Sequence, residues 1–184
     1  MKITETPLPG LVIIEPHVIE DARGYFFESF RQEKFEDAGI NVRFIQDNES
    51  KSGMGVIRGL HYQLNPFAQA KLVRVIEGTV YDVAVDLRKG SPTFGKWFGL
   101  ELDGKNKKQL FIPRGFAHGF SVLSETAVFS YKCDNYYNKD SERSISYNDP
   151  GFDIDWKIGN AKQLISEKDK NAPSFENAEM NFNF

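Results

Sequence analysis

Two of the three histidines in this sequence lie in surroundings that suit chemistry. His61 follows the basic residue Arg58 by three positions, within a run rich in strand-forming residues. His118 follows a turn that Gly115 punctuates. Imidazole changes its protonation state near neutral pH, so either ring could move a proton or, when neutral, bind a metal. His17, which follows a proline, is interpreted as an ordinary structural residue.

A metal site is one hypothesis for these rings. The Pro-x-Gly-x-x-His spacing that ends at His118 resembles the second motif of the cupins, which are small jelly-roll barrels. In metal-binding cupins the first motif supplies His-x-His and a Glu, but the matching place here reads His61-Tyr62-Gln63 and lacks the second imidazole. His61, His118 and one carboxylate could still form a facial triad of ligands. A metal-dependent cupin oxygenase is therefore one alternative function.

The elements that must position these residues have the pattern of strands. Short segments rich in Val, Ile, Phe and Tyr recur between clusters of Gly, Pro, Asn and Asp, which is typical of an all-β sandwich or barrel. Alternation along residues 81–87 predicts one apolar face and one face that carries Asp82 and Asp86. The predicted fold class is all-β, a cupin-type jelly-roll barrel. The predicted strands are Val12–Glu15, Tyr25–Phe30, Phe44–Glu49, Val56–Gln63, Lys71–Glu77, Thr79–Leu87, Lys96–Leu102, Gln109–Ile112, His118–Leu123 and Ala127–Cys133.

Helical periodicity is weak and predicts only short peripheral helices. One is expected over residues 32–38, ahead of Gly39. Another is expected near residues 166–170, where Ser166 and Asp169 have the spacing of a capping box. Composition turns polar after Trp156. We expect one cupin-like domain over residues 1–184, with the polar segment of about 157–184 packing on or near the barrel.

Length and composition exclude several classes of function. A chain of 184 residues suits one domain, and no apolar run approaches the roughly 20 residues of a membrane span. A net charge of -3 and a pI of about 5.7 lack the basic stripe typical of nucleic-acid binding. Without βαβ units or a Gly-rich phosphate loop, a nicotinamide enzyme is disfavoured. We therefore expect neither a membrane nor a nucleic acid as partner.

The single cysteine and the first residues bear on location. Cys133 cannot form a disulfide within the chain. Residues 1–7 lack the apolar stretch of a signal peptide. A reducing, cytoplasmic location is the expectation.

A series of motifs, in order along the chain, resembles the dTDP-4-dehydrorhamnose 3,5-epimerase family. They are DARGYFFE at 21–28, QDN at 46–48, RGLH at 58–61, KLVR at 71–74, VAVDLR at 83–88, SPTFG at 91–95 and GFAHGF at 115–120. The match runs from about residue 5 to about residue 170. The resemblance implies a cofactor-free and metal-free cupin, usually a homodimer. Such an enzyme inverts C3 and then C5 of a dTDP-linked 4-keto-6-deoxyhexose on the route to L-rhamnose.

The resemblance also implies four catalytic residues. His61 matches the base that removes a proton alpha to the ketone, and imidazole has a suitable pKa for that work. Asp169 matches the carboxylate that orients the ring. Lys71 matches the lysine that stabilises the enolate, and Tyr131 matches the acid that returns a proton from the opposite face of the sugar. Without the resemblance, Asp169 would be interpreted as a helix-capping residue, Lys71 as an exposed lysine and Tyr131 as a packed strand tyrosine.

Further matched positions are expected to bind the substrate. His118 and Asp82 are expected to form a supporting His–carboxylate pair. Cations suit the diphosphate and an aromatic ring can stack on thymine. We expect Arg23 and Glu28 to reach the site of the partner subunit. The other expected binding residues are Gln46, Asn48, Arg58, Tyr137, Glu142 and Lys168.

The chain departs from the family pattern late in the sequence. The family commonly has Tyr-x-Pro where Lys139 stands, Glu-Gly where Arg143 stands, and often Pro in place of Lys157. These changes border the expected nucleotide site and bear on ligand detail. An epimerase that acts at C3 only, or on a related 4-keto sugar, stays open as an alternative, as does a non-catalytic sugar-binding module.

Overall fold

The computed structural model describes the backbone of residues 1–184 and every side chain except that of Asn160. Almost all regular structure is strand. The strands are β1 (Lys2–Glu5), β2 (Val12–Glu15), β3 (Val18–Asp21), β4 (Gly24–Phe27), β5 (Gln46–Gly53), β6 (Val56–Gln63), β7 (Lys71–Glu77), β8 (Thr79–Asp86), β9 (Trp97–Asp103), β10 (Gln109–Ile112), β11 (Phe116–Val122), β12 (Thr126–Cys133), β13 (Glu142–Ser144) and β14 (Leu164–Ile165). The helices are α1 (Gln32–Glu36) and α2 (Glu167–Lys170), with 3-10 turns at Lys139–Ser141, Asn160–Lys162 and Phe175–Asn177.

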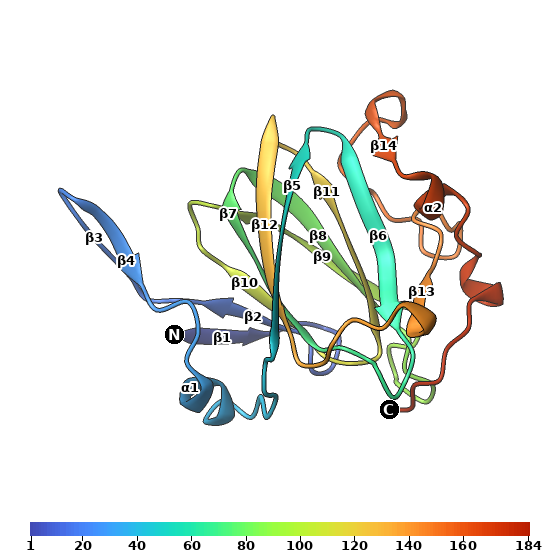
Figure 1. Cartoon of the computed structure of the whole chain (residues 1–184), viewed down its shortest axis with the longest axis horizontal. Helices are drawn as coiled ribbons and strands as arrows, with labels where there is room; N and C mark the ends of the chain where they lie inside the picture. Colours follow the sequence, from blue (N-terminus) through green and yellow to red (C-terminus); the bar gives the residue numbers. More distant parts are fainter.

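Two sheets face each other and form the walls of a barrel (Figure 1). The first has the strand order β1-β2-β10-β7-β12-β5, and the second has the order β13-β6-β11-β8-β9, with β14 added beside β6. Apolar side chains from both sheets, such as Val73 and Phe129 of the first and Val80 and Val122 of the second, share one buried core. The predicted all-β, jelly-roll fold class is confirmed.

The predicted strands match the observed ones closely, with informative differences. Four have the bounds that were predicted, among them β6 and β7, which carry His61 and Lys71. The strand predicted over 44–49 in fact runs through residues 46–53, because its polar end pairs with β12 over its whole length. The predicted strand 25–30 ends at Phe27. The prediction missed β1, β3, β13 and β14, which are short.

Strand β8 is buried on both faces. Ala84 points into the barrel core, and Val83 and Val85 belong to a second apolar cluster on the other side of the sheet. That second cluster includes Trp156 and Phe182 from the C-terminal part of the chain. The segment after β13 therefore covers the outer face of the second sheet and brings α2 against β6 (Figure 1).

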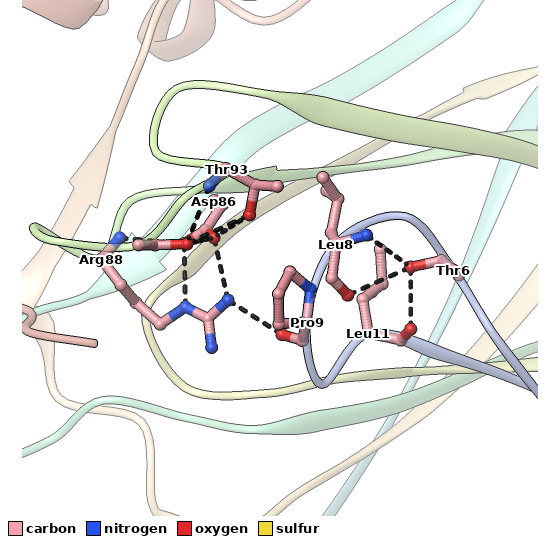
Figure 2. A network of polar contacts seen from close by, with 8 residues as sticks. Thr6, Leu8, Pro9, Leu11, Asp86, Arg88 and Thr93 are labelled. Atoms are coloured by element: carbon pink, nitrogen blue, oxygen red, sulfur yellow. Dashed lines mark hydrogen bonds and ion pairs between the residues drawn. The ribbon is translucent and has the colours of Figure 1, made fainter.

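A buried polar network fixes the loop after β8 (Figure 2). The Asp86 carboxylate is fully buried and accepts hydrogen bonds from Arg88, Ser91 and Thr93 at 2.6–2.8 Å. Arg88 also donates to the carbonyl of Pro9 at 2.9 Å. Arg88 thus joins the N-terminal loop, through a hydrogen bond, to the carboxylate at the end of β8.

The β3–β4 hairpin projects from the barrel (Figure 1). Phe26, at its edge, is 70% exposed. Two cation–π contacts brace the hairpin, from Arg74 to Phe27 and from Lys107 to Tyr25. Among the described helices, none is long and apolar enough to cross a membrane.

Candidate active site

Strand register gathers polar side chains at one end of the barrel. Gln46, Cys133 and Lys71 lie side by side across β5, β12 and β7. Two residues further along the same strands, Asn48 of β5 lies beside Tyr131 of β12. Because alternate residues share a face, Lys71 and Tyr131 lie on the same side of the sheet as the core residues Val73 and Phe129. The register thus turns these polar groups inward.

The second sheet brings the histidines to the same region. His61 of β6 lies opposite His118 of β11. The two strands approach closely at Gly59, where an added Cβ would lie 2.5 Å from the Cα of Gly119. Gly59 also has a φ of +127°, which disfavours any other residue. Glycine at this position therefore allows the close approach beside the two imidazoles.

A cavity of about 300 Å³ opens between the two groups of strands. His61, Lys71 and Tyr131 all line it, so the structure brings three of the four predicted catalytic residues to one pocket. The predicted binding residues that also line it are Gln46, Asn48, Tyr137 and Glu142. The pocket is therefore rich in groups that donate or accept protons and hydrogen bonds.

Asp169 lies behind the His61 ring. Its Oδ1 is 2.6 Å from Nε2 of His61, and the residue is only 3% exposed. Burial by itself raises the pKa of Asp169, but hydrogen bonds from His61, Ser166 and the Gly59 backbone hold that pKa below its usual value. Asp169 is therefore ionised at neutral pH and can stabilise a protonated imidazole. The alternative of an exposed capping residue is wrong for its side chain.

Lys71 is a partly buried cation. Burial lowers the pKa of its ammonium group, while Cys133, Asp82 and Glu142 oppose that shift through their charges. Among the described residues, no hydrogen bond or ion pair holds the ammonium. The group is therefore available to bind an anionic oxygen in the pocket.

Tyr131 contributes a phenol to the same pocket. Burial raises the pKa of Tyr131, with a smaller opposing effect from Arg58. The phenol is therefore protonated at neutral pH and can act as a proton donor. It comes from β12 of the first sheet, whereas His61 comes from β6 of the second. The candidate acid and the candidate base thus approach the cavity from different walls.

His118 and Asp82 form a second His–carboxylate pair beneath the pocket. The His118 Nε2 lies 3.0 Å from Asp82 Oδ2, and both side chains are buried. Burial lowers the pKa of His118, against the opposing charge of Asp82. Neither residue lines the cavity. His118 lies opposite His61 in the sheet, and a pair next to the candidate base fits support of the site.

A chain of polar contacts forms the outer rim. The Tyr137 hydroxyl donates to Glu142 at 3.1 Å, and Lys168 pairs with the same carboxylate at 2.6 Å. Burial raises the pKa of Glu142, but Lys168 and Tyr137 together bring it below its usual value. Tyr137 is 55% exposed, so its ring is accessible.

Six predicted binding residues do not line this cavity: His118, Asp82, Lys168, Arg58, Arg23 and Glu28. Arg58 opens onto a neighbouring cavity beside Lys168 and donates to Ser52 at 3.0 Å. Arg23 stands at the tip of the exposed hairpin and pairs with Asp21. Glu28 pairs with Arg31 and Lys34 below the hairpin.

The metal hypothesis can be compared with the geometry of the described side chains. Nε2 of each facing histidine is bonded to a carboxylate, His61 to Asp169 and His118 to Asp82. In the described part of the chain, no group of three or more His, Cys, Asp or Glu side chains is arranged to hold one metal ion.

Three pocket residues were not predicted. Tyr62, Gln63 and Gln69 line the cavity. Gln63 lies two residues after His61 and therefore shares its face of β6. That spacing was the available signal, because a strand that presents His61 to a pocket must present Gln63 beside it.

Comparison with known proteins identifies the family. A family model described as dTDP-4-dehydrorhamnose 3,5-epimerase matches residues 5–177. The dTDP-4-dehydrorhamnose 3,5-epimerase of Shigella flexneri is 54% identical over 180 residues, which cover 97% of this chain and 98% of that protein.

Solved structures agree with this result. The dTDP-4-dehydrorhamnose 3,5-epimerase of Elizabethkingia anophelis is 60% identical and superposes with a TM-score of 0.92, covering 96% of this chain and 97% of that one. The dTDP-6-deoxy-D-glucose-3,5-epimerase of Legionella pneumophila, solved in complex with dTDP-4-keto-L-rhamnose, is 51% identical with a TM-score of 0.92, covering 96% and 93% of the two chains. The chain belongs to the dTDP-4-dehydrorhamnose 3,5-epimerase family and is an isomerase.

Proposed function

We propose that this pocket epimerises C3 and C5 of dTDP-4-dehydro-6-deoxy-D-glucose to give dTDP-4-dehydro-L-rhamnose, a step of dTDP-L-rhamnose biosynthesis. The observation that carries the proposal is the 2.6 Å contact between His61 and buried Asp169 at a cavity that Lys71 and Tyr131 also line. The keto-sugar nucleotide bound to the Legionella pneumophila relative supports the choice of substrate.

His61 is the base in this proposal. An ionised Asp169 accepts a hydrogen bond from the Nε2–H of His61, which leaves the lone pair on Nδ1, the nitrogen able to take a proton from carbon. As the ring becomes an imidazolium, the adjacent carboxylate stabilises it. The proton that His61 removes from C3 or C5 then exchanges with solvent.

Lys71 stabilises the enolate. Removal of a proton alpha to the ketone moves negative charge onto the C4 oxygen, and a cation there lowers the barrier. Lys71 suits this role because it lines the pocket without a partner among the described residues.

Tyr131 returns the proton from the opposite face. Inversion requires an acid distinct from the base, and Tyr131 lies on the opposing wall from His61. The phenolate so formed recovers its proton from solvent. The net change is an inversion at carbon, with protons exchanged with solvent, and it needs neither a redox step nor a cofactor.

The rim holds the nucleotide. We assign Tyr137 to the thymine base, because its ring is exposed beside the pocket. Gln46, Asn48, Glu142 and Lys168 supply polar contacts, Arg58 supplies a cation for the diphosphate, and His118 with Asp82 supports the floor.

We propose a homodimer in which the hairpin of one subunit completes the site of the other. The hairpin exposes Phe26 and presents Arg23 away from the pocket of its own chain. A mixing experiment tests this arrangement. Arg23→Ala and His61→Ala are each expected to be poorly active, and a mixture that has exchanged subunits should regain activity, since one of its two sites is intact. A mixture that stays inactive would contradict a shared site.

Each chain is proposed to act as one cupin-like domain over residues 1–184, with segment 157–184 packed on the barrel. A cytoplasmic location is proposed from the single cysteine, Cys133, which is free and buried.

The reaction is tested by incubating the wild-type protein with dTDP-4-keto-6-deoxyglucose in deuterated buffer and reading the product by proton NMR and mass. Deuterium at both C3 and C5 is the expected result. Label at C3 alone would instead indicate a C3-only epimerase. A folded sample that introduces no label would contradict the proposal.

A further inference from the structure

Gln63 uses both ends of its side-chain amide. Its Nε2 donates to the carbonyl of Phe67 at 2.7 Å and to that of Tyr136 at 3.2 Å. Its Oε1 accepts from the backbone N–H of Asn138 at 2.7 Å. The residue is 5% exposed, so these bonds form largely away from water. Gln63 therefore joins β6 to the backbone on both sides of Tyr137.

The backbone of Tyr137 itself is held from the opposite sheet. Its N–H donates to Oε1 of Gln46 at 3.0 Å, and Gln46 in turn donates to Asn48 at 3.1 Å. Three consecutive residues, 136–138, are thus fixed by side-chain amides of two strands. The Tyr137 ring stays largely exposed, and only its hydroxyl is directed, toward Glu142.

We propose that Gln63 is a positioning residue that holds segment 136–138 so that the Tyr137 ring stands ready at the rim for the nucleotide base. This inference rests on the proposed function, which assigns Tyr137 to thymine. Gln63 shares the inward face of β6 with His61. One strand therefore carries both the catalytic base that acts on the sugar and the residue that holds segment 136–138. We call the hydrogen bonds from Gln63 to this segment the clamp.

The chemistry of the side chain explains why an amide suits this position. In metal-binding cupins, the matching place in His-x-His holds a second imidazole. A neutral imidazole has one donor and one acceptor, whereas the Gln63 amide donates twice and accepts once. Removal of the amide would leave the Asn138 N–H and the Tyr136 carbonyl without these partners, and segment 136–138 held through Gln46 alone among the two strand amides.

The first test uses the ligand-free protein. Gln63→Met keeps the length of the side chain and removes its hydrogen bonds. Hydrogen–deuterium exchange should become faster at residues 136–138 in Gln63→Met than in wild type. The matched control is Gln32→Met in α1, which removes an amide that donates to the carbonyl of Val42, away from the pocket. The control should leave exchange at 136–138 unchanged.

The second test is a double-mutant cycle read by titration with dTDP. Gln63→Met should weaken dTDP binding about tenfold, the size expected for about one buried hydrogen bond. In a Tyr137→Ala background the same change should have little further effect, because the clamp acts through that ring. With the full substrate, KM should rise while kcat stays near wild type.

The outcomes separate the clamp from the reaction. Unchanged exchange at 136–138 in Gln63→Met would overturn the clamp, and so would effects of Gln63 and Tyr137 on dTDP binding that simply add. Failure of the wild-type protein to bind dTDP would contradict the proposed function, and with it the nucleotide role of the clamp. The exchange measurement needs no ligand, so it reads the clamp independently.

Discussion

The Nε2 atom of His61 lies 2.6 Å from Oδ1 of Asp169, although the two residues are 108 positions apart in the chain. The contact joins β6 to the short helix α2. Ser166 caps that helix by accepting the N–H of Asp169 at 3.1 Å, so the Asp169 carboxylate can turn to the imidazole. The polar C-terminal segment therefore contributes directly to the candidate active site.

Asp169→Asn should lower kcat by about a hundredfold or more, because the amide neither fixes the tautomer nor stabilises the imidazolium. Binding of dTDP should be retained, since Asp169 lies behind His61 and does not line the main pocket. Formation of the inverted product, followed by proton NMR, measures kcat, deuterium incorporation measures proton removal, and Glu167→Gln in the same helix is the matched control. Near-normal incorporation in Asp169→Asn would remove Asp169 from the mechanism.

Activity should fall at alkaline pH because the Lys71 ammonium group loses its proton. Burial lowers its ammonium pKa, so the cation is lost as pH rises through a value below the usual lysine range, and exchange should fall there. Burial raises the pKa of Tyr131, so loss of the phenol proton comes at higher pH. Lys71→Met should cost about a hundredfold or more in kcat and abolish that alkaline fall. The same fall in the variant would show that another group causes it.

Tyr131→Phe should separate proton removal from inversion. His61 and Lys71 are intact in this variant, so a proton can still leave C3 and return from the same side. Deuterium should enter C3 while formation of the inverted product falls by about a hundredfold or more. Proton NMR distinguishes the labelled substrate from the product. Inversion at the wild-type rate would mean that another group is the acid.

Substitution of Asp86 should lower the stability of the fold without a direct effect on the reaction. Burial raises its pKa, but hydrogen bonds from Arg88, Ser91 and Thr93 bring the pKa below its usual value. The ionised Asp86 therefore stabilises the fold fully above the pKa of an aspartate in the unfolded chain, near 4. This stabilisation is lost as pH falls through the pKa of Asp86 in the folded protein.

Asp86→Ala leaves Arg88, whose side chain is only 12% exposed, without its carboxylate and should lower the free energy of unfolding by about 3 kcal/mol at neutral pH. Urea unfolding measures this difference, which should shrink at low pH. Asp155→Ala, which removes an exposed ion pair with Lys157, is the control and should change stability little. A loss equal to that of the control would contradict a stabilising role for the network.

Much of the barrel could be predicted from sequence because its signal is local. Strands such as Val56–Gln63 and Lys71–Glu77 contain Val, Ile and Leu and lie close to turn residues, and their observed bounds are those predicted. The prediction missed β13 and β14 because short strands form mainly through pairing with β6, which no local pattern records.

The sequence predicted most residues of the candidate site, but it predicted less well how those residues are placed relative to one another. Lys71 begins a strand that looks solvent-facing, and only its register beside Cys133 and Tyr131 turns it inward. Gln63 was not predicted as a site residue because its hydrogen bonds are made with a loop 73–75 residues further along the chain. Arg23 and Glu28 pair with residues near the hairpin and not with residues of their own pocket, and their proposed role depends on a second subunit.

The central claim, that His61 is the base for both carbons, is tested most directly by solvent exchange in His61→Ala. The substrate is dTDP-4-keto-6-deoxyglucose in deuterated buffer, and wild type is expected to label C3 and C5. The variant should label neither carbon while still binding dTDP, because the nucleotide contacts are proposed to lie with Tyr137 and its neighbours. Retained exchange at either carbon in folded, dTDP-binding His61→Ala would contradict the account.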